Sequence, residues 1–265
     1  MSRKRENNQN EMSFWEHLDE LRKVLIRCAV LIVVFMAAIF SAKDFVFDKI
    51  VFAPIDSDFP LYRMIDRFMH SLGLGALEPF RIGLINIDLS AQFFIHISTS
   101  FYFALVLATP FILYQLWLFV KPALYAEEKR SVIKAFSFGG VLFLTGVLVG
   151  YYLIFPLTLR FLGTYHVSAS VENQISLQSY ISTFTWLILI IGVVFEMPSL
   201  AAILSRLGII TKNLLKKYRR HAIVVLMIVA ALITPSGDPF TLMAVGIPLY
   251  ALYELSIFVC RDIDK

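Results

Sequence analysis

Long apolar stretches alternate with short charged segments along the whole chain of 265 residues. Four of these stretches carry no charge, and two more are each interrupted by a single glutamate, Glu196 or Glu254. A transmembrane helix needs about 20 predominantly apolar residues, so the pattern predicts six membrane-spanning helices. We place them at 24–42, 89–120, 135–159, 177–205, 221–236 and 239–259.

The composition supports this interpretation. The chain is 58% hydrophobic and 17% charged, with a mean hydropathy of +0.73, which is too apolar for a soluble domain. We therefore predict an all-α integral membrane protein with a single membrane domain over residues 1–265. Residues 1–23 would form a cytoplasmic amphipathic N-terminus and 43–88 the first external loop.

Basic residues gather on one side of the predicted spans. Of the 24 Lys and Arg, 18 lie in the segments 1–27, 119–134, 206–220 and 261–265. Cationic flanks are retained in the cytoplasm, which predicts cytoplasmic termini at both ends. The basic flanks that are retained in the cytoplasm account for most of the +4 net charge, so a nucleic-acid partner is not indicated. A cleavable signal peptide is disfavoured, because residues 1–23 carry five acids and no clear cleavage site follows.

Proline positions and span lengths predict the shape of the bundle. Pro110, Pro156, Pro198 and Pro248 lie inside spans, where each removes a backbone donor and tends to bend its helix. The fifth and sixth spans are short, and only the connection 234–239 joins them. We predict a concave, cup-like bundle of bent helices with a short fifth/sixth hairpin. In the external loop, apolar positions 61, 64, 65, 68, 69 and 72 predict an amphipathic helix that lies over the membrane as a cap.

Carboxylates lie just before the first apolar stretch, where basic residues alone are expected. The spacing of Phe14, Leu18, Leu21 and Leu25 predicts an interfacial helix that runs into the first span. Within this helix Lys23 can pair with Glu20 or with Asp19, and such pairing is one explanation for the acids.

The segment 115–130 again places acids among bases at the membrane surface. Adjacent helical residues point about 100° apart, so Glu127 and Glu128 cannot both face one site.

In the segments 14–25 and 115–130 the chain resembles the TatC family, the multispanning receptor subunit of the twin-arginine protein translocase. The motifs that carry the resemblance are His17-Leu-x-Glu-Leu-Arg22, Ala53-Pro54, Gln115-x-Trp117-x-Phe119, Pro122-x-Leu124-Tyr125, Glu128-Lys-Arg130, Phe195-Glu-x-Pro198 and Thr234-Pro235.

The resemblance implies a receptor for signal peptides with consecutive arginines, which Glu20 and Glu128 would contact on the cytoplasmic side. A carboxylate can hold a planar guanidinium through two parallel hydrogen bonds, whereas lysine offers a point charge. The signal-peptide site implied by the motifs comprises His17, Glu20, Leu21, Arg22, Phe119 and Glu128.

The resemblance also implies partners, a location and an energy source. The partners are small single-span subunits of the TatA/TatB type and further copies of the chain in a larger complex. The location is the cytoplasmic (inner) membrane, in contact with the lipid bilayer. There the complex would export folded proteins at the expense of the proton motive force.

Glu196 lies within a predicted span, where a charged side chain costs about 3 kcal/mol or more and must face protein or water. Three roles are compatible with this requirement. Glu196 can form a hydrogen bond between helices of this chain. It can contact a polar side chain of a single-span partner subunit, as the resemblance implies. It can also relay protons, in which case the chain is an ion-coupled small-molecule secondary transporter with Glu196 as the titrating residue.

No cofactor, metal site or enzymatic activity is indicated. The sequence contains no phosphate-binding glycine loop or interpretable catalytic triad. Its histidines, at 17, 70, 96, 166 and 221, lack ligand spacing. Among the remaining acids, Glu254 is expected to reach the cytoplasmic interface, and Asp238 to serve as a turn residue or helix cap before Pro239.

Overall fold

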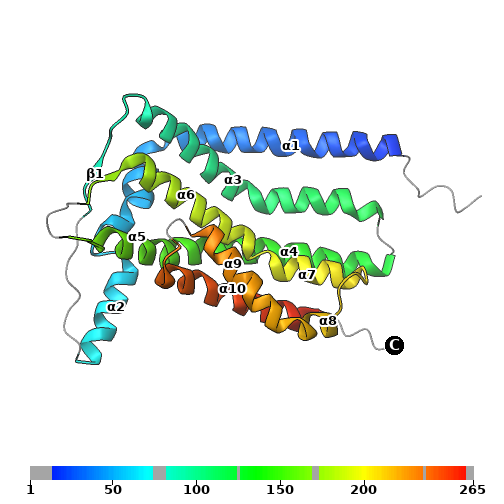
Figure 1. The fold of residues 1–265 in the computed structure, drawn as a ribbon. Coiled ribbons are helices and arrows are strands. Elements are labelled where there is room, and N and C mark those ends of the chain that lie inside the picture. Colours follow the sequence, from blue (N-terminus) through cyan, green and yellow to red (C-terminus); the bar gives the residue numbers. More distant parts are fainter. Residues whose placement is uncertain (1–13, 74–81, 124–125, 169–172, 235–236, 261–265) are drawn as a thin grey trace, which may run out of the picture.

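The structure, a computed structural model, describes residues 14–73, 82–123, 126–168, 173–234 and 237–260, with all their side chains except those at 14, 123 and 126–131. Long helices lie roughly alongside one another, and one shorter helix crosses the end of the bundle (Figure 1). The start of α1 (Phe14–Ser41) and the end of α10 (Pro239–Val259) lie at the same end of the bundle.

Among the described residues, five helical segments are long and apolar enough to cross a membrane: Trp15–Ser41, Ala91–Val120, Val132–Thr164, Leu177–Arg206 and Pro239–Val259. They coincide with five of the six predicted spans. The other predicted span, 221–236, corresponds to α9 (Arg219–Ile233), whose 15 residues rise about 22 Å, less than a hydrocarbon core of about 30 Å. The six-span count, the orientation in the membrane and the cup shape stay predictions.

The first helix packs chiefly against the second long helix. α1 joins the predicted interfacial segment and the first span in one uninterrupted helix, and it runs antiparallel to α3 (Ala91–Val120). Only 11% of the most apolar stretch of α1 is buried within the chain, against 50% for the Leu177–Arg206 segment. The remaining apolar surface of α1 therefore faces outward.

Two of the four predicted proline bends coincide with breaks in helices. α4 (Ala126–Val149) passes through a π-helix, η4 (Gly150–Ile154), into α5 (Phe155–Thr164), with Pro156 in the first turn of α5. Proline cannot donate to the preceding turn and its ring crowds the carbonyl there, which the wider π-turn accommodates.

In the same way, α6 (Leu177–Val194) and α7 (Met197–Arg206) are separated at residues 195–196, just before Pro198. The other two prolines remain inside continuous helices, Pro110 in α3 and Pro248 in α10.

Glycines set the close approach of α4, η4 and α6. A Cβ added at Gly146 would lie 2.7 Å from Phe195 Cβ and 3.0 Å from Gly192 Cα, and one at Gly150 would lie 3.2 Å from Ile188 Cα. Small residues at such positions allow helix backbones to approach and pack by van der Waals contact.

The described part of the predicted external loop contains the short helices η1 (Phe45–Val51) and η2 (Ala53–Ile55), then α2 (Pro60–Ser71), which lies across the bundle end (Figure 1). β1 (Leu84–Ile85) pairs in parallel with β2 (Ile175–Ser176), the two residues that precede α6. This pairing joins the loop to the start of α6.

Three tyrosine hydroxyls hold this loop onto the bundle. Tyr151 donates to the carbonyl of Ile50 at 3.0 Å, and Tyr180 donates to that of Val51 at 2.6 Å. The Tyr62 hydroxyl lies 3.0 Å from the Pro156 carbonyl oxygen, and burial raises the pKa of this phenol. The loop is therefore fixed to η4, α5 and α6.

The predicted amphipathic helix is confirmed as α2, but its apolar face packs only in part. Leu61 and Tyr62 in the first turn are buried, whereas Met64 and Phe68 are 61% and 64% exposed. Ile65, in the second turn, is half-buried and packs against the same cluster, so the packed part of this face is its N-terminal half.

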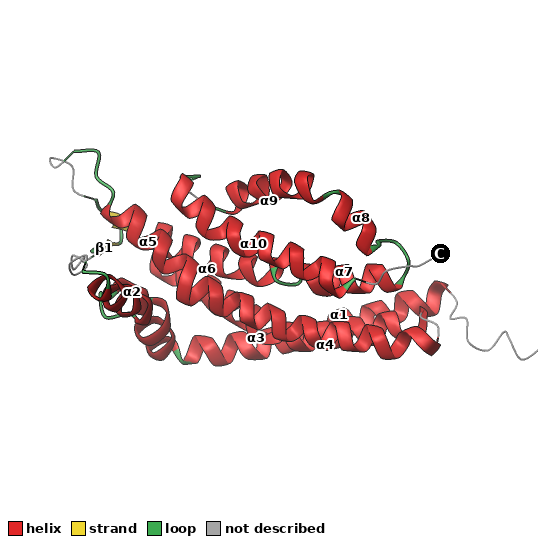
Figure 2. Ribbon diagram, turned by 90° about the horizontal axis from the view of Figure 1, so that it is seen from below, coloured by secondary structure: helices red, strands yellow, loops and turns green. Residues whose placement is uncertain are grey.

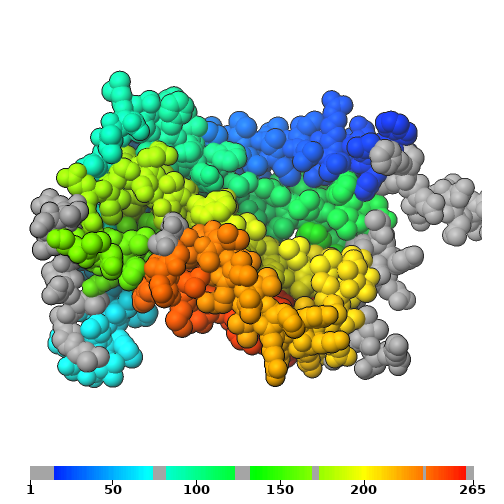
Figure 3. Space-filling view, in the orientation of Figure 1, coloured from blue at the N-terminus to red at the C-terminus, as the bar shows by residue number. Residues whose placement is uncertain are grey.

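The last part of the chain forms a hairpin along one side of the bundle. α8 (Lys212–Lys217) leads into α9, and both lie beside α10 (Figure 2). Asp238 caps α10, because its carboxylate accepts a hydrogen bond from the Thr241 N–H at 2.8 Å, which confirms the predicted cap. In Figure 3 the α9–α10 hairpin and α1 occupy opposite edges of the molecule.

Candidate functional site

The antiparallel packing of α1 and α3 brings the start of one helix to the end of the other. There the His17 ring stacks on the Phe119 ring, with centroids 4.2 Å apart and planes inclined at 27°. Two motif residues that are distant in the sequence are thus in direct contact. Next to them, buried Trp117 of α3 and Val132 of α4 belong to one apolar cluster, which packs α4 against the end of α3.

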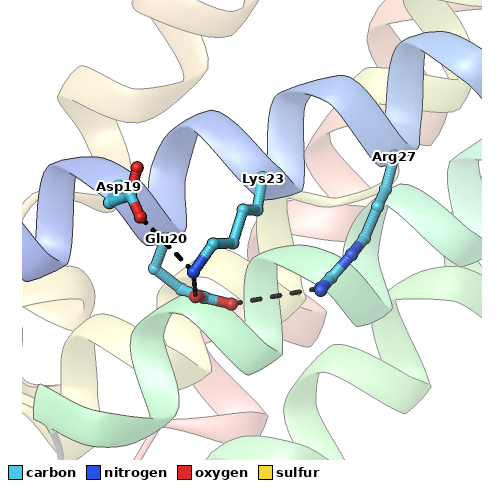
Figure 4. Close-up of polar contacts among 4 residues, drawn as sticks. All are labelled: Asp19, Glu20, Lys23 and Arg27. Atoms are coloured by element: carbon cyan, nitrogen blue, oxygen red, sulfur yellow. Dashed lines mark hydrogen bonds and ion pairs between the residues drawn. The ribbon is translucent and has the colours of Figure 1, made fainter.

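Glu20 lies one turn further along α1 than His17, in a row of charges on that helix (Figure 4). Its Oε2 is 3.5 Å from Lys23 Nζ, and its Oε1 is 4.0 Å from Arg27 Nη1. The Lys23 ammonium also lies 3.4 Å from Asp19 Oδ2. The predicted pairing of Lys23 with both acids is confirmed. The Arg27 contact was not anticipated, although its position seven residues after Glu20 puts it on the same helix face.

The ion pairs of Glu20 are weak ones. The side chains of Lys23 and Arg27 are 53% and 51% exposed, and that of Glu20 is 31% exposed. Exposed ion pairs contribute little because water and salt screen them. A guanidinium that arrives with two well-aligned N–H groups can therefore displace them at small cost and form stronger, charge-assisted hydrogen bonds.

The other predicted site residues differ in burial. Leu21 and Phe119 are half-buried, whereas Arg22 is exposed. Glu128 lies in the first turn of α4, and its side chain is outside the described ones. The meeting of Glu20 and Glu128 at one site thus stays a prediction.

Glu196 occupies the interruption between α6 and α7. It is the N-cap residue of α7 but makes no side-chain capping hydrogen bond. Its Oε1 is buried without a hydrogen-bond partner among the described residues. The Ser199 hydroxyl lies within hydrogen-bonding reach of the carboxyl group. That hydroxyl donates its own proton to the Ala135 carbonyl at 3.0 Å.

The surroundings of Glu196 include a glycine of α4 that sequence reasoning missed. A Cβ built at Gly139 would lie 2.5 Å from Glu196 Oε2 and 2.7 Å from Ser199 Oγ. Gly139 is itself buried. Only the packing of α4 against α7 identifies this neighbour, because nothing in the local sequence distinguishes Gly139 from Gly140.

Glu254 is part of a polar group that holds the last hairpin together. Its Oε2 accepts a hydrogen bond from Arg219 Nη2 at 2.7 Å, and its Oε1 accepts one from the Tyr250 hydroxyl at 3.0 Å. The Tyr253 hydroxyl donates to the Leu215 carbonyl at 2.8 Å. The bonds of Arg219 and Tyr253 tie the α8–α9 segment to α10, and that of Tyr250 lies within α10. Within the described ranges, no group of three or more His, Cys, Asp or Glu residues is arranged to hold a metal ion.

Comparison with known proteins points to one family. A sequence model of the family described as "Sec-independent protein translocase protein (TatC)" matches residues 16–248. The chain is similar to the TatC protein of Blattabacterium sp. subsp. Periplaneta americana (strain BPLAN), with 36% identity over 98% of each chain. It is 33% identical to that of Deinococcus radiodurans over 93% of this chain and 85% of the relative.

A solved structure is similar as well. It is described as "Crystal Structure of Twin Arginine Translocase Receptor- TatC in DDM" and has 32% sequence identity and a TM-score of 0.72. The similarity covers 92% of this chain and 99% of the other. The helical arrangement described above is therefore shared along nearly the full length of both chains.

Proposed function

The chain belongs to the TatC family, and from this premise we propose that it is the receptor that binds twin-arginine signal peptides for the translocase. As a TatC protein it is a membrane component of the Sec-independent protein translocase and works with other Tat subunits. It is a transport subunit and not an enzyme.

The proposed signal-peptide site is the surface formed by the start of α1, the end of α3 and the start of α4. Glu20 and Glu128 each hold one guanidinium of the arginine pair, and His17, Leu21, Arg22 and Phe119 complete the site. The observation that supports the proposal most is the state of Glu20, a half-buried carboxylate whose ion pairs with other described residues are long and have exposed partners. Such a group is available for exchange with a better-aligned partner.

Glu196 is the proposed contact for a small single-span subunit of the TatA/TatB type. Its unpartnered Oε1 supports this role, because a buried polar atom without a hydrogen bond costs free energy that a partner's polar side chain can recover. An ion-coupled transporter with Glu196 as the titrating group is the second candidate, and it has no comparable support from the family.

The remaining parts of the proposal concern location and energy. The chain lies in the cytoplasmic (inner) membrane with six spans and both termini in the cytoplasm. There it joins further copies of itself and exports folded proteins at the expense of the proton motive force.

The site is tested by photocrosslinking. A synthetic signal peptide carries a photoreactive residue beside its arginine pair, and the purified chain is reconstituted in lipid nanodiscs. We expect crosslinks to map to the start of α1 and the start of α4. The matched control is the same peptide with two lysines, which lack the planar fork and should crosslink much less. Equal crosslinking of both peptides, or crosslinks concentrated on α9 and α10, would contradict the proposed site.

A further inference from the structure

The Glu196 carboxyl group lies in a niche that exists only because residue 139 has no side chain. Gly139 is on α4 and Glu196 at the α6–α7 break, and α4 packs against both helices. The position of the missing Cβ is 2.5 Å from Oε2 and 3.2 Å from Cδ of Glu196. The distance to Oε2 is far below van der Waals contact and the distance to Cδ is tight, so an alanine at 139 and the observed carboxyl position exclude each other.

The other wall of the niche, the Ser199 hydroxyl, is held more firmly than the Glu196 carboxyl. Ser199 Oγ lies 2.7 Å from the same Cβ position and is held by its hydrogen bond to the Ala135 carbonyl, 3.0 Å away. The Glu196 carboxyl, in contrast, is at the far end of a flexible side chain. Its Oε1 has no hydrogen bond to hold it among the described residues. A methyl group at 139 would therefore clash with both groups, and the carboxyl, which lies closer and is held less firmly, would move further than the serine.

We infer that Gly139 is a positioning residue that keeps the Glu196 carboxyl retracted between α4 and α7. The retracted position keeps a polar group away from lipid, where it is costly. The carboxyl group can also move out of this position at small cost, because its Oε1 makes no hydrogen bond there with the described residues. A hydrogen-bonding side chain on a partner helix can then draw the carboxyl out, an extension that rests on the proposed role of Glu196 in partner contact.

A lipid-soluble carbodiimide tests this inference, because it forms adducts with protonated carboxyl groups that can be reached from the bilayer. The chain is reconstituted alone in phospholipid vesicles, treated with dicyclohexylcarbodiimide and quantified by peptide mass spectrometry. We expect Gly139→Ala to raise the labelled fraction of Glu196 severalfold. Glu196→Gln removes the label and thereby assigns it. Labelling of Glu254 should be equal in all variants.

Gly140→Ala is the matched control. It introduces the same methyl group into the same helix, but its Cβ would lie 3.8 Å from Leu113 Cδ1, an ordinary contact. It also brings the same gain in helix propensity. Labelling of Glu196 should remain at the wild-type level in this variant. Unchanged labelling in Gly139→Ala, or an equal rise in both alanine variants, would overturn the inference.

If Gly139→Ala lowers the thermal stability of the chain, a double-mutant cycle replaces the labelling comparison. The Glu196→Ala substitution removes the closer of the two side chains that clash with the new methyl group. Gly139→Ala should therefore cost less stability in the Glu196→Ala background than in the wild-type background, and the remaining cost reflects the 2.7 Å contact with Ser199 Oγ. A loss of equal size in both backgrounds would again overturn the inference.

The partner role of Glu196 is read out separately, by adding a co-reconstituted single-span translocase subunit. Protection of Glu196 from the label supports partner contact. Lack of protection, together with increased labelling in Gly139→Ala, would reject partner contact and leave the positioning role of Gly139 intact.

Discussion

Replacement of Glu20 by alanine should separate receptor function from helix stability. Within the chain the substitution removes two ion pairs, at 3.5 Å to Lys23 and 4.0 Å to Arg27, both with partners that are about half exposed. Pairs of this kind contribute about 0.2–0.5 kcal/mol each. The free energy of unfolding should therefore fall by no more than about 1 kcal/mol, and the helix should remain intact.

The expected effect on peptide binding is larger. Truncation of one member of a hydrogen-bonded, partly desolvated charge pair costs about 2 kcal/mol or more. That corresponds to an increase in Kd of about 30-fold or more for a twin-arginine peptide. Fluorescence anisotropy of a labelled peptide titrated with the chain in lipid nanodiscs measures this change, with thermal unfolding of the same samples as the stability readout.

Asp19→Ala is the matched control, because it removes the same unit of charge from the adjacent position. Asp19 shares Lys23 with Glu20 at 3.4 Å but is 61% exposed. Loss of an exposed charge should change binding by less than about 1 kcal/mol, or about fivefold in Kd. Lys23→Ala should tighten binding slightly, since it frees the Glu20 carboxylate. A Kd for Glu20→Ala within about fivefold of wild type, or an equal loss in Asp19→Ala, would refute the reasoning.

Three further substitutions test the packing, with thermal unfolding in detergent as the readout for each. Gly146→Ala should destabilise the chain by about 1–3 kcal/mol, because its Cβ would lie 2.7 Å from Phe195 Cβ and backbone must shift; an unchanged melting temperature would contradict the close helix approach. Tyr180→Phe should cost about 1 kcal/mol or more, since it leaves the Val51 carbonyl without its 2.6 Å hydrogen bond, and a neutral result would show that the external loop does not depend on it. Asp238→Ala should cost about 0.5–2 kcal/mol through loss of the α10 cap, whereas Asp238→Asn should retain most of the stability.

Local patterns in the sequence predicted the local features of the site. The pairing of Glu20 with Lys23 follows from their spacing on one helix, and the Asp238 cap follows from its position before Pro239. The helical character of 61–72 likewise follows from periodicity. Each of these features depends on residues within one or two helical turns, which is the range over which periodicity and capping operate.

Features that depend on which helices meet could not be predicted in this way. The stacking of His17 on Phe119 requires the register of α1 on α3, and the niche at Gly139 requires the register of α4 on α7. The π-helix before Pro156 reflects how one bend is accommodated, a choice that proline alone does not determine. Met64 and Phe68 are exposed although they lie on the apolar face of α2. Periodicity thus predicted the helix but not which of its apolar side chains pack against the rest of the chain.

The sparse burial of α1 has a consequence for the order in which the protein assembles during synthesis. α1 leaves the ribosome before the other described helices, yet its main packing partner, α3, is made only after the connection that contains α2. A helix that keeps most of its apolar surface for lipid loses little by entering the bilayer alone. The Leu177–Arg206 segment is half buried and depends on α4, which precedes it in the chain. If the helices insert in chain order, α1 enters the bilayer without a packing partner at little cost, and the Leu177–Arg206 segment enters when α4 is already present.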